Sequence, residues 1–230
     1  MAPNPKKLEL LAPAGTPEKL EIAIHYGADA VYLAGKAFSL RNFSANFSPD
    51  EMLAARRLTR EHNVRMYVAV NVYPRDSEER AIADYLDFLK TVEPDALIVA
   101  DPGIFIQARR QLPQTPLHVS TQANTTSSAT AAFWKELGAT RVNAARELSL
   151  EEIRQMVSRS GMEVEVFVHG AMCMAYSGRC LLSSYLTQRD SNRGMCSQRR
   201  KISSPTASTV SGTSTGEIRK VVIQSLPRNW

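Results

Sequence analysis

The chain of 230 residues contains few cysteines, no long apolar run and no glycine-rich nucleotide fingerprint. Its three cysteines are an odd number, which argues against a disulfide framework. No apolar run approaches the about 18 residues that a membrane-spanning helix needs. The opening residues, MAPNPKKLELLA, do not resemble a secretory leader. Neither G-x-G-x-x-G nor a P-loop follows a strand-like run, which weakens a nucleotide-binding sheet. These absences predict a cytoplasmic protein without membrane attachment.

The formal charge of +5 arises at one end of the chain. Residues 199–230 hold six basic side chains and one acid, so the preceding part carries 22 residues of each sign. Net charge therefore gives no argument that the body binds a polyanion, although a local basic face is compatible with it. Residues 199–230 are also rich in Ser and Thr, with no regular period before KVVIQSL. We expect a disordered or irregular tail there, and we favour disorder over pairing of RKVVIQS as a last strand.

Short runs rich in Val, Ile and Leu alternate with amphipathic stretches along the rest of the chain. Thr16 and Ser48 each precede a proline and suit the N-cap of a helix. The pattern predicts seven strands separated by six helices, and such repeated βα units imply parallel strands with right-handed crossovers. The fold class is therefore α/β, either a barrel or a doubly wound sheet.

Polar residues at the ends of these strands favour the barrel, because a (β/α) barrel gathers its strand ends on one rim, where active sites are built. Helix capping explains Asn71 or Asp101 individually at least as well as catalysis does. Only the whole ring of polar strand ends is therefore evidence for a barrel with a site on its rim. We predict a TIM-like (β/α) barrel over residues 1–198, incomplete with about seven strands and therefore poorly stable. The ring comprises Pro13, Gly15, Gly35, Asn71, Asp101, Thr121, Gln122, Asn124, Arg146, Glu147 and His169.

All three cysteines, Cys173, Cys180 and Cys196, lie in one segment, residues 166–198, that begins in the seventh strand. Generic core cysteines would be scattered among the strands. The spacing matches neither a C-x-x-C zinc ribbon nor the common ferredoxin run. The thiols therefore point to a site, but their spacing alone does not define its chemistry.

Three chemistries and a structural role without metal stay open on these residues. The thiolates suit an iron–sulfur cluster, with Arg179, Arg189 and Arg193 offsetting its negative charge. With His169 they form a permissible zinc ligand set. A cysteine whose pKa is lowered by neighbouring cations is also a candidate nucleophile.

A series of longer motifs resembles the peptidase U32 family, often called collagenase-like proteases. The motifs occur in order between Leu8 and Gln198: LELLAPAG, GADAVYLAG, FSLRNFSANF, YVAVNV, DALIVADPG, HVSTQAN, RVNAARELSLEEI and EVFVHGAMCMAYSGRCLLSSYLTQRDSNRGMCSQ. The chain is most similar to the branch that hydroxylates the wobble uridine of transfer RNA to 5-hydroxyuridine. That resemblance implies oxygen-independent hydroxylation, a 4Fe-4S cluster and prephenate as hydroxyl donor, with RNA as partner.

The resemblance also implies roles for particular residues. Cys173, Cys180 and Cys196 fall on cluster-ligand positions of the family signature. His169 matches a histidine beside the cluster, where it would orient substrate or handle a proton. Further substrate-binding candidates are Tyr32, Arg41, Gln122 and Arg179.

The chain departs from the family pattern after Gln198. Arg200 stands where a further cysteine is expected, which puts a fourth protein ligand and an eighth strand in doubt. We therefore expect a truncated or frame-shifted end, a missing C-terminal domain or partner subunit, and an inactive chain. A U32 peptidase and a zinc-stabilised binding module are the alternative functions.

Overall fold

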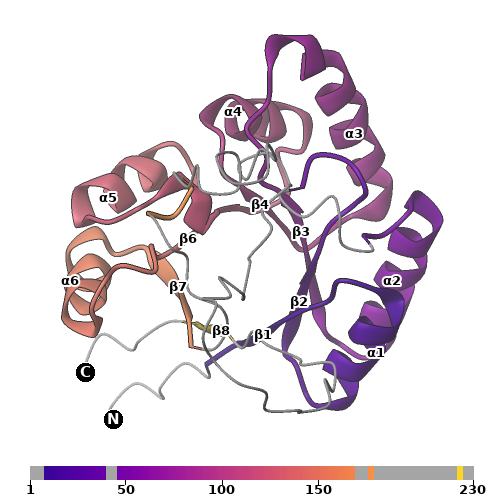
Figure 1. Cartoon of the computed structure of the whole chain (residues 1–230), viewed down its shortest axis with the longest axis horizontal. Helices are drawn as coiled ribbons and strands as arrows, with labels where there is room; N and C mark the ends of the chain where they lie inside the picture. Colours follow the sequence, from indigo (N-terminus) through magenta and orange to yellow (C-terminus); the bar gives the residue numbers. More distant parts are fainter. Residues whose placement is uncertain (1–7, 40–45, 169–175, 179–221, 225–230) are drawn as a thin grey trace, which may run out of the picture.

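The computed structural model describes residues 8–39, 46–168, 176–178 and 222–224. Within them, eight strands form a closed barrel in sequence order, with helices on the outside (Figure 1). The strands are β1 Leu10–Pro13, β2 Ala30–Leu33, β3 Arg65–Val70, β4 Ala96–Val99, β5 Leu117–Val119, β6 Arg141–Asn143, β7 Glu163–Phe167 and β8 Val222–Gln224. The predicted α/β barrel of seven parallel strands is thus confirmed.

Six α-helices follow the first six strands, as the pattern predicts. They are α1 Pro17–His25, α2 Pro49–Glu61, α3 Glu79–Val92, α4 Pro102–Gln111, α5 Ser128–Glu136 and α6 Leu150–Ser160, and two short 3-10 turns are η1 Asp76–Glu78 and η2 Thr121–Ala123. Thr16 and Ser48 are N-caps as predicted, each accepting a hydrogen bond from a backbone N–H of the first turn. These caps satisfy amides that otherwise lack a partner inside the helix.

The eighth strand departs from our expectation for the tail. Val222–Gln224 pairs antiparallel with both β1 and β7, so this part of the predicted disordered segment closes the barrel. The physical reason is that β1 and β7 would otherwise present unpaired N–H and C=O groups at facing edges. The other residues of 199–230 lie outside the described residues, and the predicted boundary at Gln198 stays a prediction.

The apolar core has two parts. The larger lies between the barrel and its helices, and includes Leu20, Met52, Leu86, Phe105 and Met156. A smaller cluster fills the barrel interior and contains Leu11, Ala30, Ala34, Tyr67, Ala69, Ala96 and Ile98, with Tyr32 and Phe167 packed against it. Small residues on β2, β3 and β4 leave room there for side chains from the other strands.

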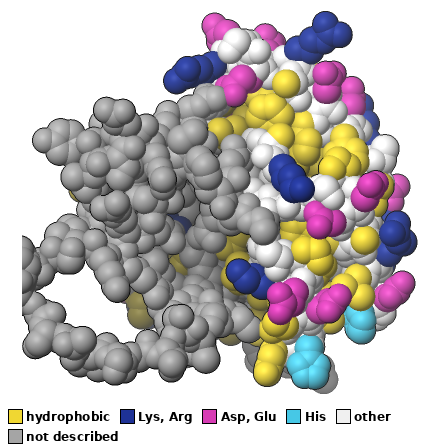
Figure 2. Space-filling model, turned by 45° about the vertical axis from the view of Figure 1, so that its right-hand side comes forward, with side chains coloured by type: hydrophobic (Ala, Val, Ile, Leu, Met, Phe, Trp, Pro, Cys, Tyr) yellow, Lys and Arg dark blue, Asp and Glu magenta, His cyan; other side chains and the backbone are white. Residues whose placement is uncertain are grey.

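Charges of both signs are mixed over the described part of the face that Figure 2 shows. Figure 2 shows Lys and Arg side chains interspersed with Asp and Glu, with apolar side chains between them. This matches the equal numbers of basic and acidic residues before residue 199. No helix within the described ranges is long and apolar enough to cross a membrane.

Candidate active site on the carboxyl rim

The carboxyl ends of the parallel strands bring several predicted polar residues together on one rim. The side-chain amide of Asn71, after β3, lies 3.5 Å from Oγ of Ser120, after β5. Asp101, after β4, instead accepts a 2.9 Å hydrogen bond from the N–H of Ile104 and caps α4. Asn71 therefore lies on the predicted rim beside Ser120, which was not among the predicted residues, whereas Asp101 is accounted for by capping and His169 lies outside the described residues.

The 3-10 turn η2 forms one wall of this rim. Oγ of Ser120 accepts a hydrogen bond from the N–H of Gln122 at 3.3 Å. The hydroxyl of Tyr73 donates to the carbonyl oxygen of Gln122 at 2.5 Å. Both of these contacts are made by the main chain of Gln122, and the substrate contact expected of its side chain stays a prediction.

Residues 176–178, the described part of the segment between Cys173 and Cys180, lie against this wall. Ser177 is 0% exposed. Its N–H donates to Oε1 of Glu147 at 2.6 Å, and its Oγ lies 3.5 Å from Oγ1 of Thr121. The N–H of Arg146 also lies 3.5 Å from that Oγ. The cysteine segment therefore contacts the rim formed by η2 and the turn after β6.

Gly178 shows how closely this segment approaches the barrel. Its φ of +74° lies in the left-handed region, and a Cβ there would lie 1.9 Å from the carbonyl oxygen of Gln122. Real Cβ atoms do not approach a backbone oxygen so closely, and a positive φ is itself unfavourable for other residues. Glycine is required at this position by both the contact and the backbone conformation.

Two adjacent residues after β6, Arg146 and Glu147, add charge of both signs to this rim. The guanidinium of Arg146 lies 4.3 Å from the centre of the Phe167 ring, a cation–π arrangement. Glu147 carries the carboxylate that contacts Ser177. Because Phe167 ends β7 two residues before His169, the rim presents a cation and an acid beside the start of the cysteine segment.

The structure describes only some of the predicted site residues. Tyr32 lies in β2 and packs against the interior apolar cluster, and Gln122 lies in η2. Outside the described residues lie Arg41, His169, Cys173, Arg179, Cys180 and Cys196. The part of the chain that is described holds no group of three His, Cys, Asp or Glu side chains suited to a metal ion.

A buried ionic cluster at the opposite end of the barrel was not predicted from the sequence. Nη1 of Arg141 lies 3.0 Å from Oε1 of Glu9 and 3.5 Å from Oε2 of Glu165. The hydroxyl of Tyr67 donates to Glu9 at 2.9 Å, and the ring of His118 packs edge-on against Tyr67. The sequence EVEVF contains a signal that could have indicated this cluster. Charged and apolar residues alternate in it, so that Glu165 lies on one face of the strand and can point into the barrel.

Burial changes the acidity of this cluster. Desolvation raises the pKa of Glu165 to about 7, against the opposing effect of Arg141. Burial and the positive charge of Arg141 hold the pKa of His118 well below its usual value. A neutral imidazole and a carboxyl group that is half protonated near neutral pH therefore lie inside the barrel.

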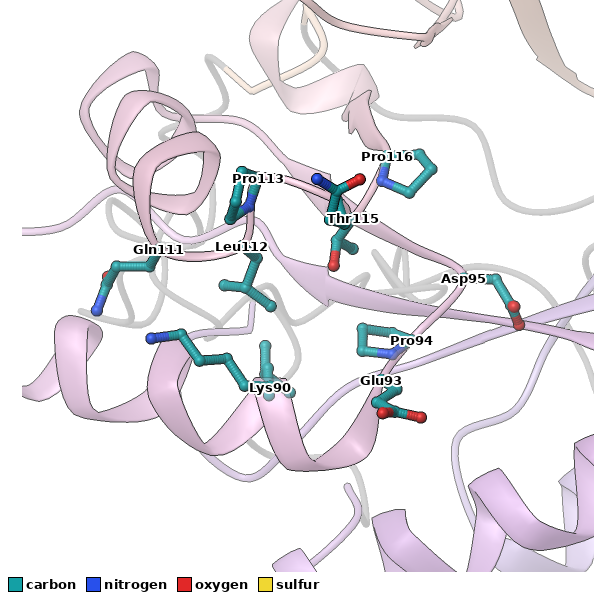
Figure 3. Close-up of a pocket in the computed structure, with 11 residues that line it drawn as sticks. Lys90, Glu93, Pro94, Asp95, Gln111, Leu112, Pro113, Thr115 and Pro116 are labelled. Carbon is teal, nitrogen blue, oxygen red and sulfur yellow. The ribbon is translucent and has the colours of Figure 1, made fainter.

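A surface groove of about 520 Å³ lies away from the rim (Figure 3). It is lined by the end of α3, the end of α4 and the turns that lead into β4 and β5, including Lys90, Glu93 and three prolines, Pro94, Pro113 and Pro116. These turns precede the strands, whereas active sites of (β/α) barrels lie at the ends that the strands reach. The groove is therefore separate from the candidate site.

Comparison with known proteins identifies the family. The sequence profile of peptidase family U32 matches residues 15–220. The chain belongs to peptidase family U32. This confirms the resemblance that the motifs carry, including those of the cysteine segment.

Several curated proteins are similar to this U32 chain. The tRNA hydroxylation protein P1 of Bacillus subtilis is 45% identical, over 84% of this chain and 46% of its own length. The tRNA hydroxylation protein P of Escherichia coli is 44% identical, over 83% and 42%. The 23S rRNA 5-hydroxycytidine C2501 synthase of Escherichia coli is 35% identical, over 86% and 30%. The chain thus spans less than half the length of these relatives.

A solved structure supports the fold. The U32 peptidase Mk0906 matches with a TM-score of 0.58 at 15% identity, over 67% of this chain and 66% of that chain. At this identity the likeness concerns the fold alone. It agrees with the β/α barrel that the described residues form.

Proposed function

We propose that this chain is the barrel part of an RNA hydroxylase that converts the wobble uridine of transfer RNA to 5-hydroxyuridine without molecular oxygen. Relatives named for tRNA hydroxylation, 44% and 45% identical over most of the chain, support this substrate. The name of the ribosomal relative also describes a hydroxylated pyrimidine. The structural observation that carries the proposal is the contact of Ser177 with the carboxyl rim, because it joins the cysteine segment to the usual place of a barrel active site.

An iron–sulfur cluster is part of the proposal. The three thiols of Cys173, Cys180 and Cys196 suit a 4Fe-4S cluster. The described residues fit this assignment in two respects: the segment contacts the rim at Ser177, and the guanidinium of Arg146 supplies positive charge there. A bound cluster would supply an iron centre for redox or Lewis-acid chemistry.

The residues of the chain itself would bind and orient the reactants. His169, two positions after Phe167, is proposed to hold or move a proton at the substrate. Tyr32, Arg41, Gln122 and Arg179 are proposed to contact the RNA or the hydroxyl donor, for which we propose prephenate. Contact with RNA would be local, since the body carries no net charge before residue 199.

Metal analysis tests the cluster directly. The chain is purified without oxygen, and iron and acid-labile sulfide are measured per chain. We expect both, and we expect their loss in Cys173→Ala. Zinc at one ion per chain without iron would instead favour the zinc-stabilised barrel, and a metal-free protein would contradict both assignments.

Activity is tested in bacteria that lack their own tRNA hydroxylation proteins. Because the chain spans less than half of its relatives' length, it is expressed alone and joined to the C-terminal part of the Escherichia coli relative. We expect 5-hydroxyuridine in digested transfer RNA from the fusion, and none when it carries Cys173→Ala. Modification that persists in that variant would contradict a role of the cysteines. Proteolysis that survives purification and depends on one cysteine would favour the peptidase alternative.

A further inference from the structure

We propose that Glu147 is a positioning residue for the cysteine segment. Its carboxylate and the close fit of Gly178 against Gln122 hold residues 176–178 on the carboxyl rim, and so restrict the positions of Cys173 and Cys180. We call these contacts among Glu147, Ser177, Gly178 and Gln122 the rim contact. This inference rests on the proposed function in one respect only, the identity of the group that the thiols bind.

The hydrogen bonds of Ser177 provide the first argument. Oε1 of Glu147 accepts from the Ser177 N–H at 2.6 Å, and Oε2 lies 3.5 Å from its Oγ. Bonds from a backbone N–H to a carboxylate are short and stronger than neutral ones. Because Ser177 is 0% exposed, water has no direct access to replace an acceptor lost at Glu147.

The shape of the contact provides the second argument. At Gly178 an added Cβ would also lie 2.8 Å from the hydroxyl oxygen of Tyr73, besides its overlap with the carbonyl of Gln122. Tyr73 itself donates to that carbonyl, so the surface that Gly178 meets is held in place by a further hydrogen bond. A side chain at position 178 would therefore displace the segment from the rim.

Chain connectivity extends this restriction to the thiols. Successive Cα atoms are about 3.8 Å apart, so the Cα of Cys180 lies within about 8 Å of the Cα of Gly178. Cys173 precedes Ser177 by four residues and is limited in the same way to about 15 Å. Fixing residues 176–178 thus narrows the arrangements that the two thiols can adopt before anything binds them, which is preorganisation of a site.

Thiol reactivity in the metal-free chain tests the rim contact. Alkylation rates of Cys173, Cys180 and Cys196 are measured residue by residue by mass spectrometry, in the folded chain and in urea. We expect Glu147→Ala to raise the rates at Cys173 and Cys180 by about tenfold, the effect of losing one strong hydrogen bond. Glu147→Gln keeps an acceptor oxygen and should bring both alkylation rates most of the way back to those of the parent chain. Rates in Glu147→Ala within twofold of the parent chain would overturn the proposal.

Two glycines form a matched pair for the steric argument. Gly27 has a φ of +83° and nothing within 4 Å of an added Cβ, whereas Gly178 has a φ of +74° and meets Gln122. Gly178→Ala should raise the alkylation rates at Cys173 and Cys180, while Gly27→Ala should leave them unchanged. Equal rates in the two variants would contradict the contact. Circular dichroism shows whether Glu147→Ala folds. If it does not fold, the two glycine variants still test the rim contact.

The bound cluster provides a readout that separates this inference from the proposed function. In chains reconstituted without oxygen, Glu147→Ala should lower iron and sulfide per chain and change the visible absorption, and Glu147→Gln should recover both. If the parent chain binds no iron, the proposed cluster is wrong, while the alkylation results still decide the rim contact. Normal iron, sulfide and absorption in Glu147→Ala would show that the residue does not position the ligands.

Discussion

Arg141 and Glu165 face each other inside the barrel, from the neighbouring strands β6 and β7, with Nη1 and Oε2 3.5 Å apart. Their side chains are 2% and 3% exposed. Arg141 is closer to Glu9, at 3.0 Å, and Glu9 also pairs with Arg65 and accepts from Tyr67. Burial therefore raises the pKa of Glu165 to about 7, and Arg141, which lies closer to Glu9, offsets this effect only in part.

The first prediction concerns stability against pH. The pKa of Glu165 is raised from 4.5 to about 7 in the folded chain, so between these values only the folded state keeps the proton. The free energy of unfolding should fall as pH rises through this range, by about 3 kcal/mol in total, and stay low above pH 7. Urea unfolding at intervals from pH 5 to pH 8 measures the slope.

Glu165→Gln should remove this dependence, because glutamine resembles the protonated acid and does not titrate. At pH 8 the variant should be at least as stable as the parent chain. Glu163→Gln, on the same strand with a side chain that is 43% exposed, serves as the control and should keep the slope. Parallel curves for the parent chain and Glu165→Gln would show that the carboxyl group does not titrate in this range.

The second prediction concerns the cation of the interior cluster. Arg141→Ala leaves the buried carboxylate of Glu9 without its interior partner, which should destabilise the barrel by about 3 to 5 kcal/mol at neutral pH. In the double variant Arg141→Ala with Glu165→Gln, the loss in the free energy of unfolding should be smaller than the sum of the losses in the two single variants. The reason is that Glu165→Gln removes one acid that Arg141→Ala leaves uncompensated. Thermal and urea unfolding give the comparison, and additive losses would argue against coupling of the two side chains.

The third prediction compares two ion pairs on α2. Arg56 makes a bidentate contact with Asp95, at 2.6 and 3.2 Å, and the same carboxylate accepts from the N–H of Met66. Arg60 pairs with Glu93 on the surface, with side chains 54% and 65% exposed. Arg56→Ala should destabilise the fold by about 1 to 3 kcal/mol.

Arg60→Ala is the control for this pair and should leave stability unchanged within error, because exposed ion pairs are screened by water and salt. Both variants remove one arginine from the same helix, so helix propensity and net charge change equally. A larger loss for Arg60→Ala than for Arg56→Ala in urea unfolding would contradict the ranking by burial.

The fourth prediction tests closure of the barrel by β8. Ile223 is paired with Leu10 on one side and with Val166 on the other. Ile223→Pro removes a backbone N–H from this strand, and should lower stability by about 1 to 3 kcal/mol. Ile223→Val keeps the N–H and is the control. If the two variants unfold at the same urea concentration, Val222–Gln224 does not contribute to closure.

Particular residues show which features of the fold could be predicted from the sequence. Thr16 and Ser48 cap their helices as predicted, because a cap depends on residues within one turn. Asn71 lies on the rim as predicted, since parallel strands place their ends together, but its neighbour there is Ser120, which the sequence did not single out. Asp101 shows the limit, because the same polar residue caps a helix whether or not a site is near.

The candidate site depends on longer contacts. The pairing of Ser177 with Glu147 joins residues 30 apart, and Arg141 meets Glu9 across 132 positions. No local pattern contains this information. Such contacts depend on the register of the strands and on the position of residues 176–178 against the rim.

The amino-acid sequence by itself determined the repeated βα units, the helix ends, the family and the cysteines that make a cluster the leading hypothesis. The βα units and the helix ends follow from periodicity and capping, which are local, whereas the family and the cluster that it implies follow from motifs in order along the chain. The tertiary structure alone decided that the tail closes the barrel between β1 and β7, that an ionic cluster lies buried at one end, and that Glu147 contacts the cysteine segment at the other. Each of these requires distant residues to be brought within hydrogen-bond range, which only closure of the barrel achieves.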